Sequence, residues 1–124
     1  MTALETSSLI AYLSGDVGVD VNAIEAALQL HQAVLPPIVV TELLSDPHLD
    51  QEAESFLRKI PQLDIREGYW ERAGELRAGV LRGGFKAALA DTLIAQSCLD
   101  HDIALITRDR DFRHFARFGG LRLR

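Results

Sequence analysis

Four carboxylates stand where acidic side chains could act together on one ligand. Glu5, Glu42 and Asp109 each follow a short apolar run of the kind that forms a buried strand. Asp91 instead lies on the apolar face of a predicted helix, where an unpaired charge is costly. Converging carboxylates raise each other's pKa unless a cation neutralises them. Their oxygens suit Mg²⁺ or Mn²⁺, and a pair of such ions supports the attack of water on a phosphodiester.

Each of these acids also has a simpler explanation. A carboxylate in the first turn of a helix stabilises the helix dipole, and Asp109 is placed to cap the last predicted helix. Such roles explain the four acids together less well, because the fold rule for parallel sheets brings three of them to one edge. We therefore keep both interpretations for each acid and favour a shared site for the set.

The elements that must position these acids alternate between apolar runs and helical periodicity. Strands are predicted at 3–4, 38–40, 103–106 and 121–123, with a weaker one at 63–65. Helices are predicted to begin at Ser7 or Ser8, at Asp20 or Asn22, at Thr41 and at Asp50, and to span 69–80, 87–99 and 109–118. This alternation predicts an α/β fold, a three-layer α/β/α domain with a central, mainly parallel sheet of four or five strands.

Length and charge narrow the possible functions. The chain has 124 residues, of which 48% are hydrophobic, which suits one domain over 1–124. The net charge is −5, yet no Lys or Arg precedes Arg58, so a uniformly basic nucleic-acid coat and a polybasic N-terminal arm are excluded. We expect a cytoplasmic protein, because neither a secretory signal nor a membrane-spanning run is visible.

Cysteine and histidine offer no competing chemistry. Cys98 is the only cysteine, which excludes an intramolecular disulfide framework and a multi-cysteine zinc site. We expect it in the core, because no basic residue lies near it in sequence. None of the four histidines is paired at helical spacing. Tyr69 is predicted in the core, whereas Trp70 lies off that stripe and is available for a contact with a second copy of the chain or with another protein.

Four stretches in order resemble the motifs of the PIN-domain family. They are Leu4-Glu5-Thr6-Ser7-Ser8-Leu9-Ile10, Thr41-Glu42-Leu43-Leu44, Ala90-Asp91-Thr92-Leu93-Ile94-Ala95 and Leu105-Ile106-Thr107-Arg108-Asp109-Arg110-Asp111-Phe112. The order and spacing match across essentially the whole chain, and the length resembles that of stand-alone VapC-type toxins of prokaryotic toxin–antitoxin pairs. One position departs from the family, which has Asp where this chain has Glu5.

The resemblance implies a Mg²⁺- or Mn²⁺-dependent endoribonuclease that hydrolyses RNA phosphodiesters by metal-activated water. It assigns the catalytic and metal-binding roles to Glu5, Glu42, Asp91 and Asp109. Ser7 and Thr107 are implied to orient the acids or a water, and Asp111 is an additional acid. A small cognate antitoxin is the implied protein partner, and a homodimer is the implied assembly.

Arginines gather toward the C-terminus and admit two interpretations. They can form a solvated helix face and a charged edge strand that discourages edge pairing. They can also guide RNA phosphates to the site. Arg108 and Arg110 flank Asp109, so they are the predicted RNA-binding residues.

Two other functions compete with the nuclease. A phospho-acceptor receiver domain needs paired acids after the first strand and a lysine near the end of the chain. Neither is present, because Glu5 has no adjacent acid and no lysine follows Lys86. A degenerate PIN domain would bind RNA or a protein partner without efficient cleavage. The basis for that alternative is Glu5, whose extra methylene would displace a metal-binding carboxylate.

Overall fold

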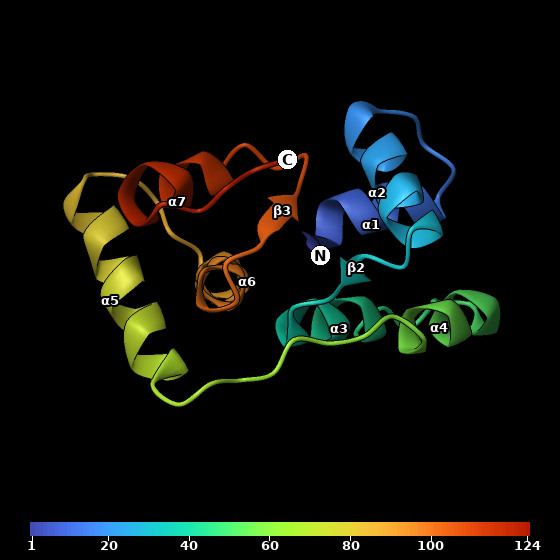
Figure 1. Cartoon of the computed structure of the whole chain (residues 1–124), viewed down its shortest axis with the longest axis horizontal. Coiled ribbons are helices and arrows are strands. Elements are labelled where there is room, and N and C mark those ends of the chain that lie inside the picture. Colours follow the sequence, from blue (N-terminus) through green and yellow to red (C-terminus); the bar gives the residue numbers. More distant parts are fainter.

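The computed structural model describes residues 1–124 as seven helices and three strands (Figure 1). Their order is β1 (Thr2–Leu4), α1 (Thr6–Leu13), α2 (Val19–Gln29), β2 (Ala33–Val34), α3 (Pro37–Leu44), α4 (Gln51–Arg58), α5 (Tyr69–Arg82), α6 (Leu89–Asp100), β3 (Ala104–Ile106) and α7 (Phe112–Gly119). None of the helices combines the length and hydrophobicity needed to cross a membrane.

The strands form a parallel sheet in the order β2-β1-β3. Thr2 is paired with Ala33 on one side and with Ala104 on the other. Two further segments meet the sheet edges through single parallel bridges, from Leu35 to Gln62 and from Leu105 to Leu123. The predicted parallel sheet is therefore confirmed, but only three segments are strands, and the predicted four or five are reached only by counting these one-residue bridges.

Helices cover the sheet from both sides and bury its strands. Helix α2 contacts β2 and β3, and α6 contacts β3 as well as α3, α5 and α7. In Figure 1, α1 and α2 lie on one side of β3, and α5, α6 and α7 lie on the other. Leu4, Ile94, Leu105 and Ile106 are completely buried between them. This arrangement agrees with the predicted α/β class.

The apolar run at 38–40, predicted as a strand, is part of helix α3. Pro37 occupies the first turn, where the missing N–H costs nothing and the fixed φ suits a helix. Val39 and Leu43 are buried one turn apart, so this face of the helix packs on the core. As a consequence, Glu42 lies in the last turn of α3 and not at the end of a strand.

Several predicted helix starts also need correction. Asp50 caps α4 as predicted, because its Oδ1 accepts a hydrogen bond from the Ala53 N–H at 2.7 Å. The other predicted starts differ from the structure. Glu5, and not Ser7 or Ser8, caps α1, and α2 begins after Gly18, before the predicted Asp20 or Asn22. Thr41 lies inside α3, and α7 begins after Asp111, later than the predicted 109. No strand forms at 63–65, and the contact with the sheet is the single bridge between Leu35 and Gln62, with the Leu63 N–H donating to the Leu35 carbonyl at 2.9 Å.

Candidate metal centre

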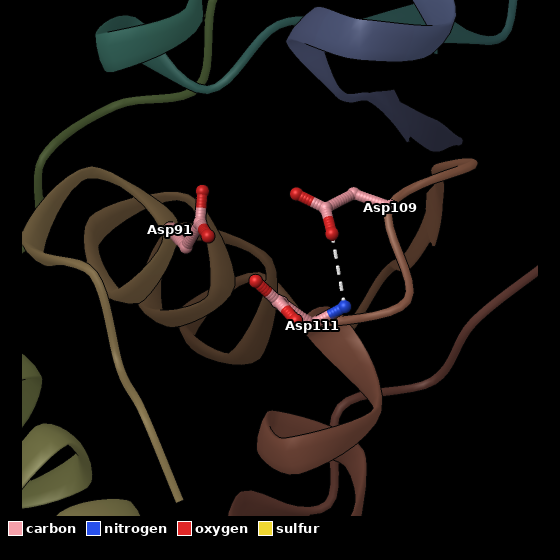
Figure 2. A group of neighbouring side chains, drawn as sticks. All are labelled: Asp91, Asp109 and Asp111. Atoms are coloured by element: carbon pink, nitrogen blue, oxygen red, sulfur yellow. Dashed lines mark hydrogen bonds between the residues drawn. The ribbon is translucent and has the colours of Figure 1, made fainter.

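Three aspartates from separate parts of the fold face one another (Figure 2). Asp91 lies in the first turn of α6, Asp109 lies in the loop after β3, and Asp111 occupies the N-cap position of α7 without a side-chain capping bond. One carboxylate oxygen from each lies within 4.8 Å of the others. All three residues are partly buried, so the cluster is partly accessible to solvent. Such a spacing is short enough for one ion to contact all three residues.

Local hydrogen bonds fix the loop that carries Asp109. Its N–H donates to the Thr107 Oγ1 at 3.0 Å. Its Oδ1 accepts from the Asp111 N–H at 2.9 Å, the bond drawn in Figure 2. These bonds set the turn between β3 and α7, because each ties residues two positions apart. The structure therefore brings Asp111, predicted as an additional acid, directly into the cluster with Asp109.

Glu5 reaches the site from the end of β1. The Glu5 N–H donates to the Ile106 carbonyl at 3.0 Å, which extends the β1–β3 ladder by one residue. The side chain is only 4% exposed, and its Oε2 accepts from the Ser7 N–H and the Thr107 Oγ1 at 2.9 Å each and from the Ser7 hydroxyl. Both hydroxyls predicted to orient an acid thus contact the same oxygen of Glu5.

Glu42 is held by a residue that was not predicted. Its Oε1 accepts a hydrogen bond from the Thr6 Oγ1 at 2.6 Å, across the contact between α1 and α3. Thr6 belongs to the same stretch, 4–10, that contains Glu5 and Ser7. The position of Thr6 in that stretch could have indicated a role at the site. Its hydrogen-bond partner, Glu42, is known only from the packing of α1 on α3.

The acids act on one another electrostatically. The pKa of Asp91 is raised from its ordinary value of 3.8 to about 6, first by burial and then by the charges of Asp109, Glu5, Glu42 and Asp111. The charges of Glu5 and Glu42 therefore act on Asp91, although only Asp91, Asp109 and Asp111 offer oxygens within 4.8 Å of one another. No ion pair neutralises Asp91, Asp109, Glu5 or Glu42. A partly buried, oxygen-only donor set with unbalanced negative charge fits a divalent cation such as Mg²⁺ or Mn²⁺.

The cationic residues near the cluster differ from those expected. The Lys86 Nζ lies 3.6 Å from the Asp111 Oδ2, a contact that the sequence did not indicate. Arg108 instead forms hydrogen bonds with the Asp20 carboxylate at 2.7 and 3.2 Å, and its Nη1 lies 3.8 Å from Asp16. These contacts compete with the predicted role of Arg108 in RNA binding. Arg110 is exposed, and RNA binding by either arginine stays a prediction.

The remaining sequence expectations concern the core. Cys98 is completely buried, and burial raises the pKa of its thiol to about 12, which confirms a core residue. Tyr69 is also buried, and its hydroxyl donates to the Leu93 carbonyl at 2.6 Å. Trp70 is exposed, as its position off the apolar stripe predicted. None of these side chains takes part in the acid cluster.

Three solved structures share the fold over nearly their whole length. VapBC2 from Rickettsia felis, bound to a DNA fragment from its promoter, matches with a TM-score of 0.75 and 21% identity over 99% of this chain and 96% of that one. FitAcB from Neisseria gonorrhoeae matches with a TM-score of 0.72 and 22% identity, over 99% of this chain and 96% of that one. A toxin–antitoxin complex from Klebsiella pneumoniae matches with a TM-score of 0.68 and 23% identity, over 98% of this chain and 95% of that one. At these identities the likeness establishes the fold.

The family follows from the sequence match. The comparison with curated proteins gives no significant match. Residues 3–118 match the PIN domain, a span that includes every carboxylate of the cluster. The match extends over almost the whole chain and agrees with the four motif stretches and with the parallel sheet. The chain therefore belongs to the PIN-domain family.

Proposed function

We propose that this protein is a Mg²⁺- or Mn²⁺-dependent endoribonuclease and the toxin of a toxin–antitoxin pair. The observation that carries the proposal is the cluster of Asp91, Asp109 and Asp111 in a PIN domain, where burial and then the charges of the neighbouring acids, Glu5 and Glu42 among them, raise the pKa of Asp91. PIN domains are generally nucleases, which supports hydrolysis of a phosphodiester. RNA as the substrate rests on the resemblance to VapC-type toxins.

The acids have separable roles in this proposal. Glu5, Glu42, Asp91 and Asp109 would hold the cation, and Asp111 would support them. A bound divalent ion supplies charge neutralisation at the phosphate and lowers the pKa of a coordinated water. Ser7 and Thr107 restrain the Glu5 carboxylate, and Thr6 restrains that of Glu42. The protein's contribution is therefore to hold the carboxylates against their mutual repulsion before the cation arrives.

The biological role rests on the structural neighbours. They are toxin–antitoxin complexes, among them VapBC of Salmonella typhimurium and FitAB, both solved with bound DNA. We propose by analogy that a small cognate antitoxin binds this chain in the cytoplasm and blocks the site, and that the toxin is a homodimer. A short neighbouring reading frame with a DNA-binding pattern would support this assignment.

One experiment tests the enzyme. The purified, antitoxin-free chain is incubated with total RNA in Mn²⁺, in Mg²⁺ and in EDTA, and the ends of the fragments are mapped. We expect discrete cleavage with either ion, fragments that end in a 3′-hydroxyl, and no cleavage in EDTA. The Asp91→Asn variant is expected to lose cleavage while remaining folded. Cleavage that persists in EDTA or in this variant would contradict the proposal.

A second candidate function is a degenerate PIN domain that binds RNA or a protein without efficient cleavage. The observation behind it is that the Oε2 of Glu5 accepts three hydrogen bonds, which leaves Oε1 as the oxygen free for a cation. A misplacement near 1 Å can slow a reaction about 100-fold. If the extra methylene of Glu5 slows the reaction, Glu5→Asp should raise the single-turnover rate of cleavage by up to about 100-fold. A lower rate in Glu5→Asp would instead mean that the longer acid suits this site.

A further inference from the structure

Lys86 brings a positive charge to the acid cluster from a part of the chain that the sequence motifs do not cover. It lies between α5 and α6, and its Nζ is 3.6 Å from the Asp111 Oδ2. The lysine side chain is 77% exposed and that of Asp111 is 40% exposed. An ion pair this open to water contributes little stability, because solvent screens it and the side chain loses entropy in forming it.

The backbone on both sides of Lys86 is nevertheless held in place. The Phe85 ring stacks on His114 at 4.7 Å between centroids and lies 5.5 Å from Phe118, so it packs on α7. On the other side, Ala87 is buried, and its carbonyl accepts a hydrogen bond from the Arg77 Nε of α5 at 2.8 Å. The anchors fix where the lysine emerges, while its flexible stem leaves the ammonium free to move.

An RNA phosphate next to the clustered Asp91, Asp109 and Asp111 would need a cation beyond the metal to offset their repulsion. Lys86 is the residue whose ammonium already pairs with the cluster, whereas Arg108 is engaged with Asp20. Exchanging a weak, exposed contact with Asp111 for a phosphate oxygen costs little. Lysine also suits this task, because its ammonium is a compact charge on a long stem.

We propose that Lys86 is a phosphate-binding residue of this site, which leaves Asp111 and contacts an RNA phosphate when RNA reaches the carboxylates. The proposal rests on the proposed ribonuclease function and names a residue that this function did not use. A phosphate contact by Lys86 can be distinguished from a purely structural ion pair with Asp111. A lysine that only pairs with Asp111 affects the site without RNA, whereas a phosphate contact changes the salt dependence of RNA binding.

The test measures RNA binding and metal binding separately. A short fluorescein-labelled single-stranded RNA is titrated by fluorescence anisotropy in Ca²⁺, an oxygen-seeking ion of looser geometry, and a denaturing gel checks that the probe stays intact. Lys86→Ala is expected to weaken binding roughly 3–10-fold at low salt and to reduce the slope of log K against log salt by about 0.7. Lys86→Arg should keep the slope, and Lys59→Ala, which changes the only other lysine, should match the wild type.

Isothermal titration with Mn²⁺ supplies the second readout. Lys86→Ala should bind Mn²⁺ as tightly as the wild type or more tightly, because the competing ammonium is gone. Lys86→Gln repeats both measurements with the stem retained and the charge removed. An unchanged salt slope in both neutral variants would overturn the Lys86 proposal alone, provided that the wild type binds RNA. A wild type that binds Mn²⁺ but no RNA would overturn the proposed function and the phosphate contact together.

Discussion

Replacing Asp91 with asparagine should make the metal-free protein more stable at about pH 8. The side chain is partly buried, and its ionised form is opposed by four neighbouring carboxylates. Asparagine has nearly the same shape and no charge, so it removes the cost of burying a charge and the repulsion without opening a cavity. A stabilising substitution at a proposed metal-binding residue is the behaviour expected of a site that sacrifices stability for function.

The magnitude follows from the shift in pKa. The pKa of Asp91 rises from 3.8 to about 6 on folding, and each unit corresponds to about 1.4 kcal/mol. The full shift would give about 3 kcal/mol, and solvent screening at this half-buried site reduces it to about 1–2 kcal/mol. For a domain of this size that is roughly 3–8 °C in unfolding temperature.

The sign of the pH dependence is opposite to that of a salt-bridged acid. Between about pH 4 and pH 6 the native state binds more protons at Asp91 than the unfolded state does, so the stability of the wild type falls as the pH rises. Above about pH 6 the full cost is present. The advantage of Asp91→Asn should therefore be largest at pH 8 and should shrink toward zero near pH 4.

The assay is thermal unfolding followed by circular dichroism in EDTA, at about pH 8 and pH 4. Asp64→Asn is a matched control, because Asp64 is exposed and lies outside the cluster. With Mn²⁺ at about 100 times its dissociation constant the wild type should gain about 2.7 kcal/mol, and the variant should gain less. If Asp91→Asn is neutral or destabilising at pH 8 in EDTA, the reasoning that burial and repulsion make the ionised Asp91 costly is refuted.

Three further outcomes are expected. The Mn²⁺ affinity of the wild type, measured by isothermal titration, should fall about tenfold per pH unit below pH 6, because a proton on Asp91 competes with the ion. Thr107→Val should lower the free energy of unfolding by about 1–3 kcal/mol in urea titrations and weaken Mn²⁺ binding, because Glu5 and the Asp109 N–H each lose a partner. Arg108→Ala should lower the unfolding temperature at pH 7, and the difference should disappear as the pH falls from 4 to 2, where Asp20, whose pKa this arginine lowers to about 2, becomes protonated.

Matched substitutions separate these effects from general damage. Thr41→Val changes an exposed threonine of α3, and Arg122→Ala breaks a pair in which both side chains are exposed. Both should leave stability nearly unchanged. A flat Mn²⁺ affinity between pH 7 and pH 5 would argue against Asp91 as a ligand. Equal losses in the threonine pair, or in the arginine pair, would argue against the specific contacts assigned to Thr107 and Arg108.

The sequence predicted the fold where periodicity was strong and long. The α4 and α5 helices and the strand within 103–106 were found because their patterns extend over several residues. The run at 38–40 misled because a short β-branched segment reads alike as a buried strand or a buried helix segment. The true strand beside it, Ala33–Val34, has two residues, which is too short to leave a pattern.

The site was predictable to the extent that its residues follow elements directly. Glu5 and Asp109 lie just beyond β1 and β3, so the rule for the carboxyl ends of parallel strands places both at one edge of the sheet. Only the structure shows that β1 and β3 are neighbours in that sheet. Glu42 was predicted to follow a strand, and it lies instead in the last turn of α3. Its hydrogen bond with Thr6 depends on how α1 packs on α3, and that contact has no signature in local sequence.

Charge near the site shows why adjacency in sequence is a poor guide to contact. Arg108 adjoins Asp109 in the chain, yet its guanidinium pairs with Asp20 and joins the loop after β3 to α2. Lys86 is remote from Asp111 in sequence, yet the packing of Phe85 on α7 brings the two together. Judged by helical spacing from Asp91 alone, Lys86 lies off the relevant face. The cation near this cluster is therefore found through tertiary packing and not through sequence spacing. Phe85 packs on α7, and this contact places the neighbouring Lys86 beside Asp111.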